Sequence, residues 1–431
     1  MNPVSRRTFI QTSAAASAAM AFPFGVRLHG SDVIRVGVVG CGGRGTGAAR
    51  DCMRGSEGVE IVAMGDLMAD RLAQSRAELA KAVASNAALA AKFKVTDERC
   101  FTGFDAYRKV IESDVDLVIL ATPPGFRPAH LEAAVAAGKH IFTEKPVAVD
   151  AAGIRSVLAT AEEAKRRNLA VVAGTQRRHQ AEYIEAIRRI HDGAIGEVVG
   201  GQVFWNQGGL WHRARQSAWT DAEWQIRNWL YFTWLSGDHI VEQHVHNIDV
   251  ANWVLGAHPV KAMGVGGRQF RTGPEYGHIY DHFAIDFEYP GGARVLSMCR
   301  QIEGTRDRIG EHFTGTAGRS NPASFIQGAS PWKYEAPPRE QRISPYVQEH
   351  TDLVASLRAG TPLNELRQVA ESTLTAIMGR EAAYTGQEIT WDQMLNAQQT
   401  LTPPAIAFGP LDVPPVPMPG RTKLDRAWGA E

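Results

Sequence analysis

Lys145 is the residue whose position is hardest to explain as a contribution to stability alone. It stands in the run Glu144-Lys145-Pro146, between an apolar segment at residues 140–143 and a proline. An ammonium group held at the end of a buried strand can donate a hydrogen bond to a hydroxyl or carbonyl oxygen. We therefore predict that Lys145 is catalytic.

Glu242 and His246 form a second chemical pair, because they lie one helical turn apart. If residues 239–249 form a continuous helix, both side chains share one face. A carboxylate one turn away can orient and charge an imidazole, which makes a general acid/base near neutral pH. His246, oriented by Glu242, is the predicted proton-transfer residue, and His244 faces the apolar side.

The histidines around Glu242 are also of the type that ligates metals. In a helix, however, His244 and His246 point in roughly opposite directions, so one ion cannot easily take both. The sequence therefore predicts no metal.

A glycine loop lies about a hundred residues before Lys145. Its spacing is G-x-G-x-x-G, with a β-branched strand before it at residues 33–39 and a helix after it at 46–54. In this context the glycines permit a tight turn, close approach of backbone to a pyrophosphate, and close helix packing. The helix N-terminus then faces the phosphates. The predicted loop contacts are Gly40, Gly42, Gly43, Arg44 and Gly45.

Asp66 follows the second predicted strand, 21 residues after Gly45. A carboxylate there can accept hydrogen bonds from the adenosine ribose and repels a 2′-phosphate, so NAD is favoured over NADP. Arg71 nearby can still accept a phosphate, so NADP stays possible. The remaining predicted cofactor contacts end parallel strands: Thr122, Pro123, Glu144 and Lys145.

Six of the ten tryptophans lie between Trp205 and Trp234, interleaved with polar side chains. Aromatic faces with neighbouring hydrogen-bonding groups suit a sugar ring, and Trp205 and Trp229 are the predicted substrate contacts. Core packing or a subunit interface explains the same residues equally well.

These residues need two different frameworks to hold them. Strands and helices alternate over residues 31–150, which predicts a doubly wound parallel sheet of the Rossmann type. Over residues 151–400, strands follow one another without intervening helices, which predicts a second α/β domain with an open, mostly antiparallel sheet. Residues 401–431 form a proline-rich tail, with seven prolines between Thr402 and Gly420.

Length and composition agree with two domains and a small-molecule partner. A chain of 431 residues exceeds what one core usually serves. The 46 basic and 46 acidic side chains leave no net charge to drive binding to nucleic acid or to an anionic membrane. The four cysteines are irregularly spaced, which excludes a disulfide framework.

The first thirty residues are predicted to be an export signal. Ser5-Arg6-Arg7-Thr8-Phe9-Ile10 has the twin-arginine pattern and precedes a short, weakly apolar run. The predicted protein is periplasmic or otherwise exported, and its first partner is the twin-arginine export machinery. No stretch approaches the roughly 20 apolar residues that an integral membrane span needs.

The glycine loop, Glu144-Lys145-Pro146 and the segment His246-Asn247-Ile248-Asp249 together resemble the Gfo/Idh/MocA oxidoreductase family. The resemblance covers residues 33 to about 385. It implies catalytic roles for Lys145, Glu242 and His246. The chain has Glu242 where the family commonly has aspartate, and His244 where glycine is common, so the acid/base could instead be His244.

The resemblance also implies a class of substrate and a way of holding the cofactor. Arg177 and His179 lie in a segment that enters the substrate domain in this family and are predicted to reach the substrate, as is His244. Members oxidise or reduce sugars and polyols, often as homo-oligomers, here a dimer or tetramer. Because free nicotinamide is not available outside the cytoplasm, the cofactor is expected to be tightly bound.

Three functions therefore remain open at the level of sequence. The first is an exported NAD(P)-dependent oxidoreductase that acts on CH–OH groups of a carbohydrate or polyol. The second is a redox-neutral NAD-dependent glycoside hydrolase or lyase that works through a transient 3-keto sugar. The third is a non-catalytic sugar-binding protein.

Overall fold

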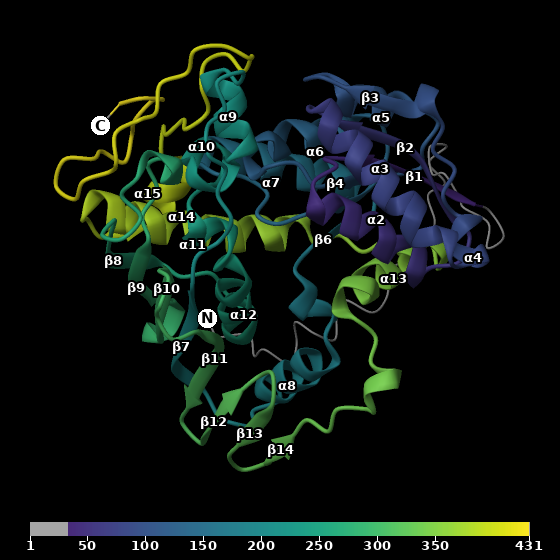
Figure 1. The fold of residues 1–431 in the computed structure, drawn as a ribbon. Coiled ribbons are helices and arrows are strands. Elements are labelled where there is room, and N and C mark those ends of the chain that lie inside the picture. The colour runs from purple at the N-terminus through teal and green to yellow at the C-terminus, as the bar shows by residue number, and fades with distance from the viewer. Residues whose placement is uncertain (1–32, 431) are drawn as a thin grey trace.

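The computed structural model describes residues 33–430, and the predicted signal peptide, residues 1–30, lies outside the described residues. The N-terminal part is a six-stranded parallel sheet of order β3-β2-β1-β4-β5-β6 (Figure 1). This is the strand order of a Rossmann domain, with its switch point between β1 and β4. The strands are β1 Ile34–Val39, β2 Val59–Asp66, β3 Cys100–Thr102, β4 Leu117–Leu120, β5 His140–Thr143 and β6 Val171–Ala173.

Helices cover both faces of this sheet, and one of them returns from far along the chain. α13, Pro345–Arg358, packs against α2 and against the last strand, β6. The sixth strand also lies beyond residue 150, so the expected domain boundary falls before the last strand of the sheet. The other helices of this part are α2 Gly43–Gly55, α3 Ala69–Ala84, α4 Ala87–Ala90, α5 Ala106–Glu112, α6 Arg127–Ala136 and α7 Ala151–Arg166.

The alanine-rich segment 69–91 is divided into two helices, α3 and α4. Asn86 has an extended backbone, with φ of −137°, and its side chain accepts a hydrogen bond from the Leu89 N–H. Asparagine competes for backbone hydrogen bonds in this way and starts a new helix. Asn86 therefore separates α4 from α3.

The second part contains a nine-stranded sheet of order β14-β13-β12-β11-β7-β10-β9-β8-β15. All neighbouring strands are antiparallel except β7 and β10, so the predicted mostly antiparallel sheet is confirmed. The strands are β7 Val198–Gln207, β8 Lys261–Gly267, β9 His282–Glu288, β10 Arg294–Gln301, β11 Arg308–Gly315, β12 Gly318–Asn321, β13 Phe325–Gln327, β14 Trp332–Lys333 and β15 Ile389–Thr390.

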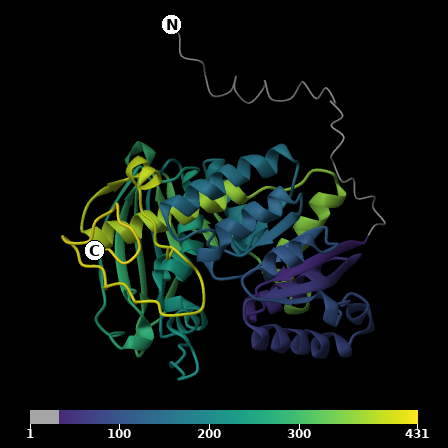
Figure 2. The same cartoon turned by 90° about the horizontal axis from the view of Figure 1, so that it is seen from above.

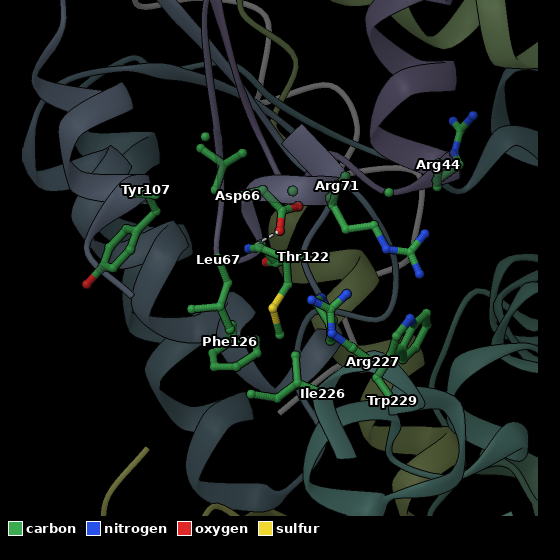
Figure 3. Close-up of a pocket in the computed structure, with 18 of the residues that line it drawn as sticks. Arg44, Asp66, Leu67, Arg71, Tyr107, Thr122, Phe126, Ile226, Arg227 and Trp229 are labelled. Carbon is green, nitrogen blue, oxygen red and sulfur yellow. Dashed lines mark hydrogen bonds between the residues drawn. The ribbon is translucent and has the colours of Figure 1, made fainter. Parts of the chain in front are cut away.

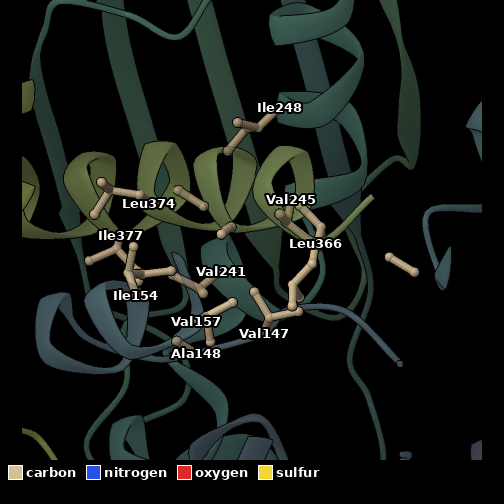
Figure 4. Packing of buried hydrophobic residues seen from close by; sticks show 14 of the residues in the cluster. Val147, Ala148, Ile154, Val157, Val241, Val245, Ile248, Leu366, Leu374 and Ile377 are labelled. Carbon is tan, nitrogen blue, oxygen red and sulfur yellow. The ribbon is translucent and has the colours of Figure 1, made fainter. Parts of the chain in front are cut away.

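A helical layer joins this sheet to the Rossmann domain (Figures 1 and 2). The 20-residue helix α14 packs against β8 and β9 on one side and against α7 on the other. Figure 4 shows apolar side chains of α7, α11, α12 and α14 interlocking in this layer. The helices are α8 Ala181–His191, α9 Asp221–Arg227, α10 Thr233–Ser236, α11 His239–Glu242, α12 Val245–Leu255, α14 Leu366–Thr385 and α15 Trp391–Asn396.

The proline-rich tail is an ordered covering without helices or strands, which agrees with its composition. Arg426 is fixed in the core by ion pairs with the fully buried Glu381, and the hydroxyl of Tyr280 donates a hydrogen bond to the Pro417 carbonyl at 2.8 Å. The tail lies beside α9 and α10 (Figure 1). It therefore belongs to the same surface as the segment that follows β7.

Candidate active site

The glycine loop connects β1 to α2 and packs as its spacing predicts. Gly40 has a φ of +92°, which side chains rarely adopt. A Cβ at Gly45 would lie 1.8 Å from the Gly40 carbonyl oxygen, so only glycine allows this contact. These two glycines fix the turn and the approach of the helix.

Gly42 and Gly43 have a different surrounding, because a Cβ on either would meet nothing within 4 Å. Both line a cavity of about 490 Å³ at the carboxyl ends of β1, β2 and β4. The size is within the range of cofactor sites. A backbone cradle at a helix N-terminus that opens into such a cavity fits the pyrophosphate of a dinucleotide.

Gly42→Val tests this cradle. Gly42 has a φ of −74°, which valine accepts, and the open space should let the variant fold with an unchanged unfolding temperature. The added side chain would occupy the pyrophosphate position, so bound nucleotide should be lost. Gly47→Val on the same helix is the matched control, because its Cβ meets only the end of Arg44 at 3.6 Å. Equal nucleotide content in both variants would refute the placement of the cradle.

Asp66 lies at the end of β2 and lines the cavity beside Leu67 and Arg71 (Figure 3). Its carboxylate accepts hydrogen bonds from the backbone N–H groups of Cys41, at 2.6 Å, and Met68, at 2.8 Å. Burial raises the pKa of this carboxyl. Asp66 therefore stabilises the glycine loop as well as standing at the predicted ribose position.

Thr122 and Pro123 also line the cavity, after β4. Arg127, which the sequence analysis missed, donates hydrogen bonds to the carbonyls of both Thr122 and Glu144. This fully buried guanidinium thus holds the ends of β4 and β5 at the same edge of the sheet. The only local signal was an arginine beside Pro128 at the start of a predicted helix.

Arg44 and Glu144 contact each other rather than standing separately at the cofactor. Arg44 forms ion pairs with Glu144, with Asp51 at 3.6 Å and with Glu349 at 2.9 Å. Glu349 comes from α13, and burial together with the charge of Glu144 raises its pKa well above the usual value. Arg44 lines the cavity, so its charge faces the predicted cofactor as well.

Lys145 pairs with Glu242 across the two domains. Its Nζ donates hydrogen bonds to the Glu242 carbonyl at 2.5 Å and to the carboxylate Oε1 at 3.1 Å. Both side chains are almost buried, at 9% and 12% exposed. The carboxylate that was predicted to orient His246 is therefore the partner of the lysine, and no hydrogen bond among residues 33–430 joins Glu242 to His246.

The reason is that residues 239–249 do not form one helix. α11 ends at Glu242, and α12 begins at Val245. At the break, the His244 N–H donates to the His239 carbonyl at 3.1 Å, and the His244 Nε2 lies 2.8 Å from the Ser297 hydroxyl. Because of the break, Glu242 and His246 lie on two separate helices. The prediction that both side chains share one face of a single helix was therefore wrong.

His244 is fully buried in this break. Burial, with the nearby charge of His239, lowers its pKa to about 3. A neutral, hydrogen-bonded imidazole without exposed surface does not reach a substrate in this structure. The structure therefore gives His244 a packing role, and its predicted contact with the substrate has no exposed imidazole surface to support it.

His246 lies against Trp205, with ring centroids 5.6 Å apart and an interplanar angle of 27°. The Arg177 guanidinium lies 5.6 Å from the Trp205 ring. Burial, and then the positive charges of Lys145 and Arg177, hold the pKa of His246 well below its usual value. The structure therefore brings Lys145, Glu242, His246, Trp205 and Arg177 into one group, in which the imidazole is neutral and can accept a proton.

Arg177 and His179 are both held by carboxylates. Arg177 pairs with the buried Glu311 at 3.1 Å. The ring nitrogens of His179 lie 2.6 Å from Asp352 and 3.4 Å from Glu365. Burial opposes charging of His179, but these two carboxylates outweigh it and raise its pKa to about 10. Nδ1 is thus hydrogen-bonded to Asp352, whereas Nε2 lies near Glu365 without a hydrogen bond, and the substrate contact of His179 stays a prediction.

The tryptophans divide into three groups. Trp224 and Trp234 are buried in an aromatic core. Trp211 and Trp229 line the cavity beside the glycine loop, and Trp205 stands beside His246. Trp229, a predicted substrate contact, thus lines the same cavity as the glycine loop.

Within residues 33–430, no group of three or more histidine, cysteine, aspartate or glutamate side chains is placed to hold a metal ion. None of the helices described is both long and apolar enough to cross a membrane. These two findings concern the described residues only.

Sequence comparison matches both halves of the chain. Residues 34–173 match the GFO_IDH_MocA oxidoreductase family with its NAD-binding Rossmann fold, and residues 183–320 match the GFO/IDH/MocA C-terminal domain. Residues 3–23 match the twin-arginine translocation signal, so the chain is exported.

Among curated relatives, inositol 2-dehydrogenase 4 of Saccharopolyspora erythraea is 30% identical over 223 residues, which are 52% of this chain and 54% of that enzyme. Two further curated relatives are covered over 65% of their length. The chain thus spans about half to two thirds of these relatives.

Solved structures share the fold. Scyllo-inositol dehydrogenase from Lactobacillus casei with bound NAD(H) and scyllo-inositol has a TM-score of 0.62 at 17% identity, covering 84% of this chain and 100% of that one. Levoglucosan dehydrogenase in complex with NADH and levoglucosan has a TM-score of 0.64 at 18% identity, with the same coverage. With a Rossmann domain, the matching C-terminal domain and an export signal, the chain belongs to the Gfo/Idh/MocA family of oxidoreductases.

Proposed function

We propose that this exported oxidoreductase transfers a hydride between a hydroxyl-bearing carbon of a sugar or polyol and a tightly bound nicotinamide cofactor. The observation that carries the proposal is the group formed by Lys145, Glu242 and His246 at the carboxyl edge of the Rossmann sheet. Arg127 holds this edge to the cavity wall at Thr122. The proposed proton-transfer groups do not line the cavity themselves, but they belong to the same edge of the sheet as the cavity that fits a dinucleotide.

Lys145 is the proposed hydrogen-bond donor to the reacting oxygen. Glu242 holds its ammonium in place through a carboxylate and a carbonyl. A fixed ammonium stabilises negative charge that develops on the oxygen as the hydroxyl proton leaves. Glu242 is thus a positioning residue for the lysine.

His246 is the proposed general base. It is buried and neutral, and the ring of Trp205 fixes its orientation. A neutral imidazole accepts the hydroxyl proton, and the nearby charge of Lys145 discourages its premature protonation. Trp205 and Arg177 are the proposed walls of the substrate site, where an aromatic face suits a sugar ring.

A nicotinamide dinucleotide, when bound here, supplies the hydride acceptor or donor. Gly42, Gly43 and Arg44 would hold its pyrophosphate, and Asp66 its adenosine ribose, which favours NAD. Arg71 could accept the 2′-phosphate of NADP, so NADP stays an alternative cofactor. Two relatives of this fold are described with NAD(H) or NADH and a polyol or anhydrosugar, which supports both the cofactor and the substrate class.

The test is to add a panel of sugars, polyols and glycosides to the purified mature protein and to follow reduced-nicotinamide absorbance together with the products. An oxidised sugar with a rise in absorbance supports the oxidoreductase. A cleaved glycoside without net oxidation would instead establish the hydrolase or lyase. Ligand binding without any cofactor signal would indicate a sugar-binding protein.

We also propose a homo-oligomer formed through the open sheet. The face of this sheet that α12 and α14 leave uncovered exposes apolar side chains on neighbouring strands, including Met263 and Val265 at 59% and 69%. Exposed apolar residues gathered on one face are typical of an interaction site. A second copy of the chain is the proposed partner.

A further inference from the structure

The segment 208–230, which follows β7 and contains α9, reaches across to the Rossmann domain. Five of its side chains line the cofactor cavity opposite Asp66 and Leu67: Trp211, Arg213, Ile226, Arg227 and Trp229. Figure 3 shows Ile226, Arg227 and Trp229 on one side of the cavity, and Asp66, Leu67 and Arg71 on the other. We call residues 208–230 the clasp.

Arg227 ties the clasp to the Rossmann domain. Its Nη1 and Nη2 donate to the two carboxylate oxygens of Asp70 in α3, at 2.9 and 3.0 Å. Glu223 fixes the same guanidinium at 2.9 Å, and the Trp219 ring lies 5.0 Å from it. A bidentate pair of this kind is geometrically specific, so it defines where the clasp meets α3.

The clasp is also fixed within the second domain. The fully buried Asn228 accepts a hydrogen bond from the Arg213 N–H at 2.8 Å and donates one to the Glu275 carbonyl at 2.6 Å. The Trp224 indole donates to the Arg213 carbonyl at 3.0 Å. The cavity-lining residues are thus preorganised, which lowers the cost of ordering them around a ligand.

The proline-rich tail makes a second bridge. Gln225 in the clasp donates to the Leu411 carbonyl at 2.8 Å, and the Ala222 N–H donates to the Gly409 carbonyl at 3.1 Å. Phe408, which precedes Gly409 in the tail, packs on Phe104 of the Rossmann domain with ring centroids 5.1 Å apart. Phe104 itself lines the cavity.

The charge of the clasp suits an anionic ligand. Arg71, Arg213 and Arg227 all line the cavity. Among residues 33–430, only Arg227 of these three forms an ion pair, with Asp70 and Glu223. Burial, and then the charges of Arg71 and Arg227, lower the pKa of Arg213. A phosphate-bearing ligand would relieve this crowding of guanidinium groups.

We infer that the clasp and the tail bind the adenosine half of the dinucleotide and set the rate at which the cofactor leaves. This inference rests on the proposed function, because it assigns the retention of the cofactor to named contacts. Release requires the wall formed by the second domain to move away from α3 and Phe104. The clasp thus explains how an exported enzyme keeps a cofactor that it cannot replace.

The experiment measures cofactor release from the full mature protein loaded with NADH. Nicotinamide fluorescence is followed after a chase with excess NAD. Arg227→Gln should release NADH about fivefold faster, as expected for the loss of a partly exposed ion pair. Trp229→Ala should release it about tenfold faster or more, since an aromatic wall is lost. Phe408→Ala tests the tail without altering the cavity lining contributed by the clasp.

Arg166→Gln is the matched control, because Arg166 forms an exposed ion pair with Glu163 on α7. Its release rate should equal that of the parent protein. Unchanged release in all three test variants, with the parent loaded, would overturn the clasp and leave the proposed function standing. A parent protein that takes up no dinucleotide would overturn both. The unfolding temperature without nucleotide identifies any variant whose fold is damaged.

Discussion

Lys145→Met is expected to lower kcat by roughly 10²- to 10⁴-fold, the range for loss of an acid/base group, while the nucleotide stays bound. The physical reason is that the ammonium, held by Glu242, is the proposed donor to the reacting oxygen, whereas the proposed cofactor contacts are the glycine loop and Asp66. Turnover and bound nucleotide are measured on the same preparation.

Two further variants separate chemistry from structure. Lys109→Met removes an exposed lysine of α5 that pairs with Asp105, and its turnover should match the parent. Lys145→Arg keeps a positive charge beside Glu242 but replaces a compact ammonium with a planar fork, so turnover should remain low. Parent-like turnover of Lys145→Met would remove the lysine from the mechanism.

His246→Asn is expected to lower kcat by roughly 10²- to 10⁴-fold, because the proposed base is lost. In the parent, burial and the charges of Lys145 and Arg177 depress the pKa of His246. The imidazole therefore stays neutral, and able to accept a proton, as the pH falls through 6.5. The acid limb of kcat/KM attributable to His246 should accordingly lie below pH 6.5, and it should disappear in the variant.

His244→Gln provides the contrast between the two histidines. His244 is buried and bonded to Ser297, so its replacement should lower the unfolding temperature without changing the pH profile of the folded enzyme. If His244→Gln instead removed turnover in a stable protein, and His246→Asn did not, the acid/base assignment would be reversed.

The parts of this structure that the sequence predicted well are those fixed by local patterns. The glycine loop has a turn, a packing contact and an open cradle that follow from spacing alone. Alternation of strands and helices predicted the Rossmann sheet. Lys145 was singled out because a lysine between a buried strand and a proline has no evident packing role, and its catalytic role stays a prediction. The strands β11 to β14, which extend the second sheet beyond β7, were missed.

The parts that were missed depend on contacts between distant residues. Ser297, which is 53 positions away, contacts His244 at the break between the two helices. Glu242 therefore pairs with Lys145 and not with His246. Arg44 meets Glu349 across 305 positions. The periodicity of the sequence could predict neither contact, because it describes only residues a few positions apart. The sequence likewise could not predict that Trp229 lines the cavity beside the glycine loop. An aromatic side chain can pack in a core, against a sugar or against a nucleotide equally well.

The most direct test is to denature the purified mature protein and to identify and count any nucleotide that it releases. A dinucleotide held between the glycine loop and the clasp should survive purification, so NAD or NADP should appear in near-equal amount to the chain. A preparation that contains no nucleotide, and that neither NAD nor NADP can then load, would contradict the account.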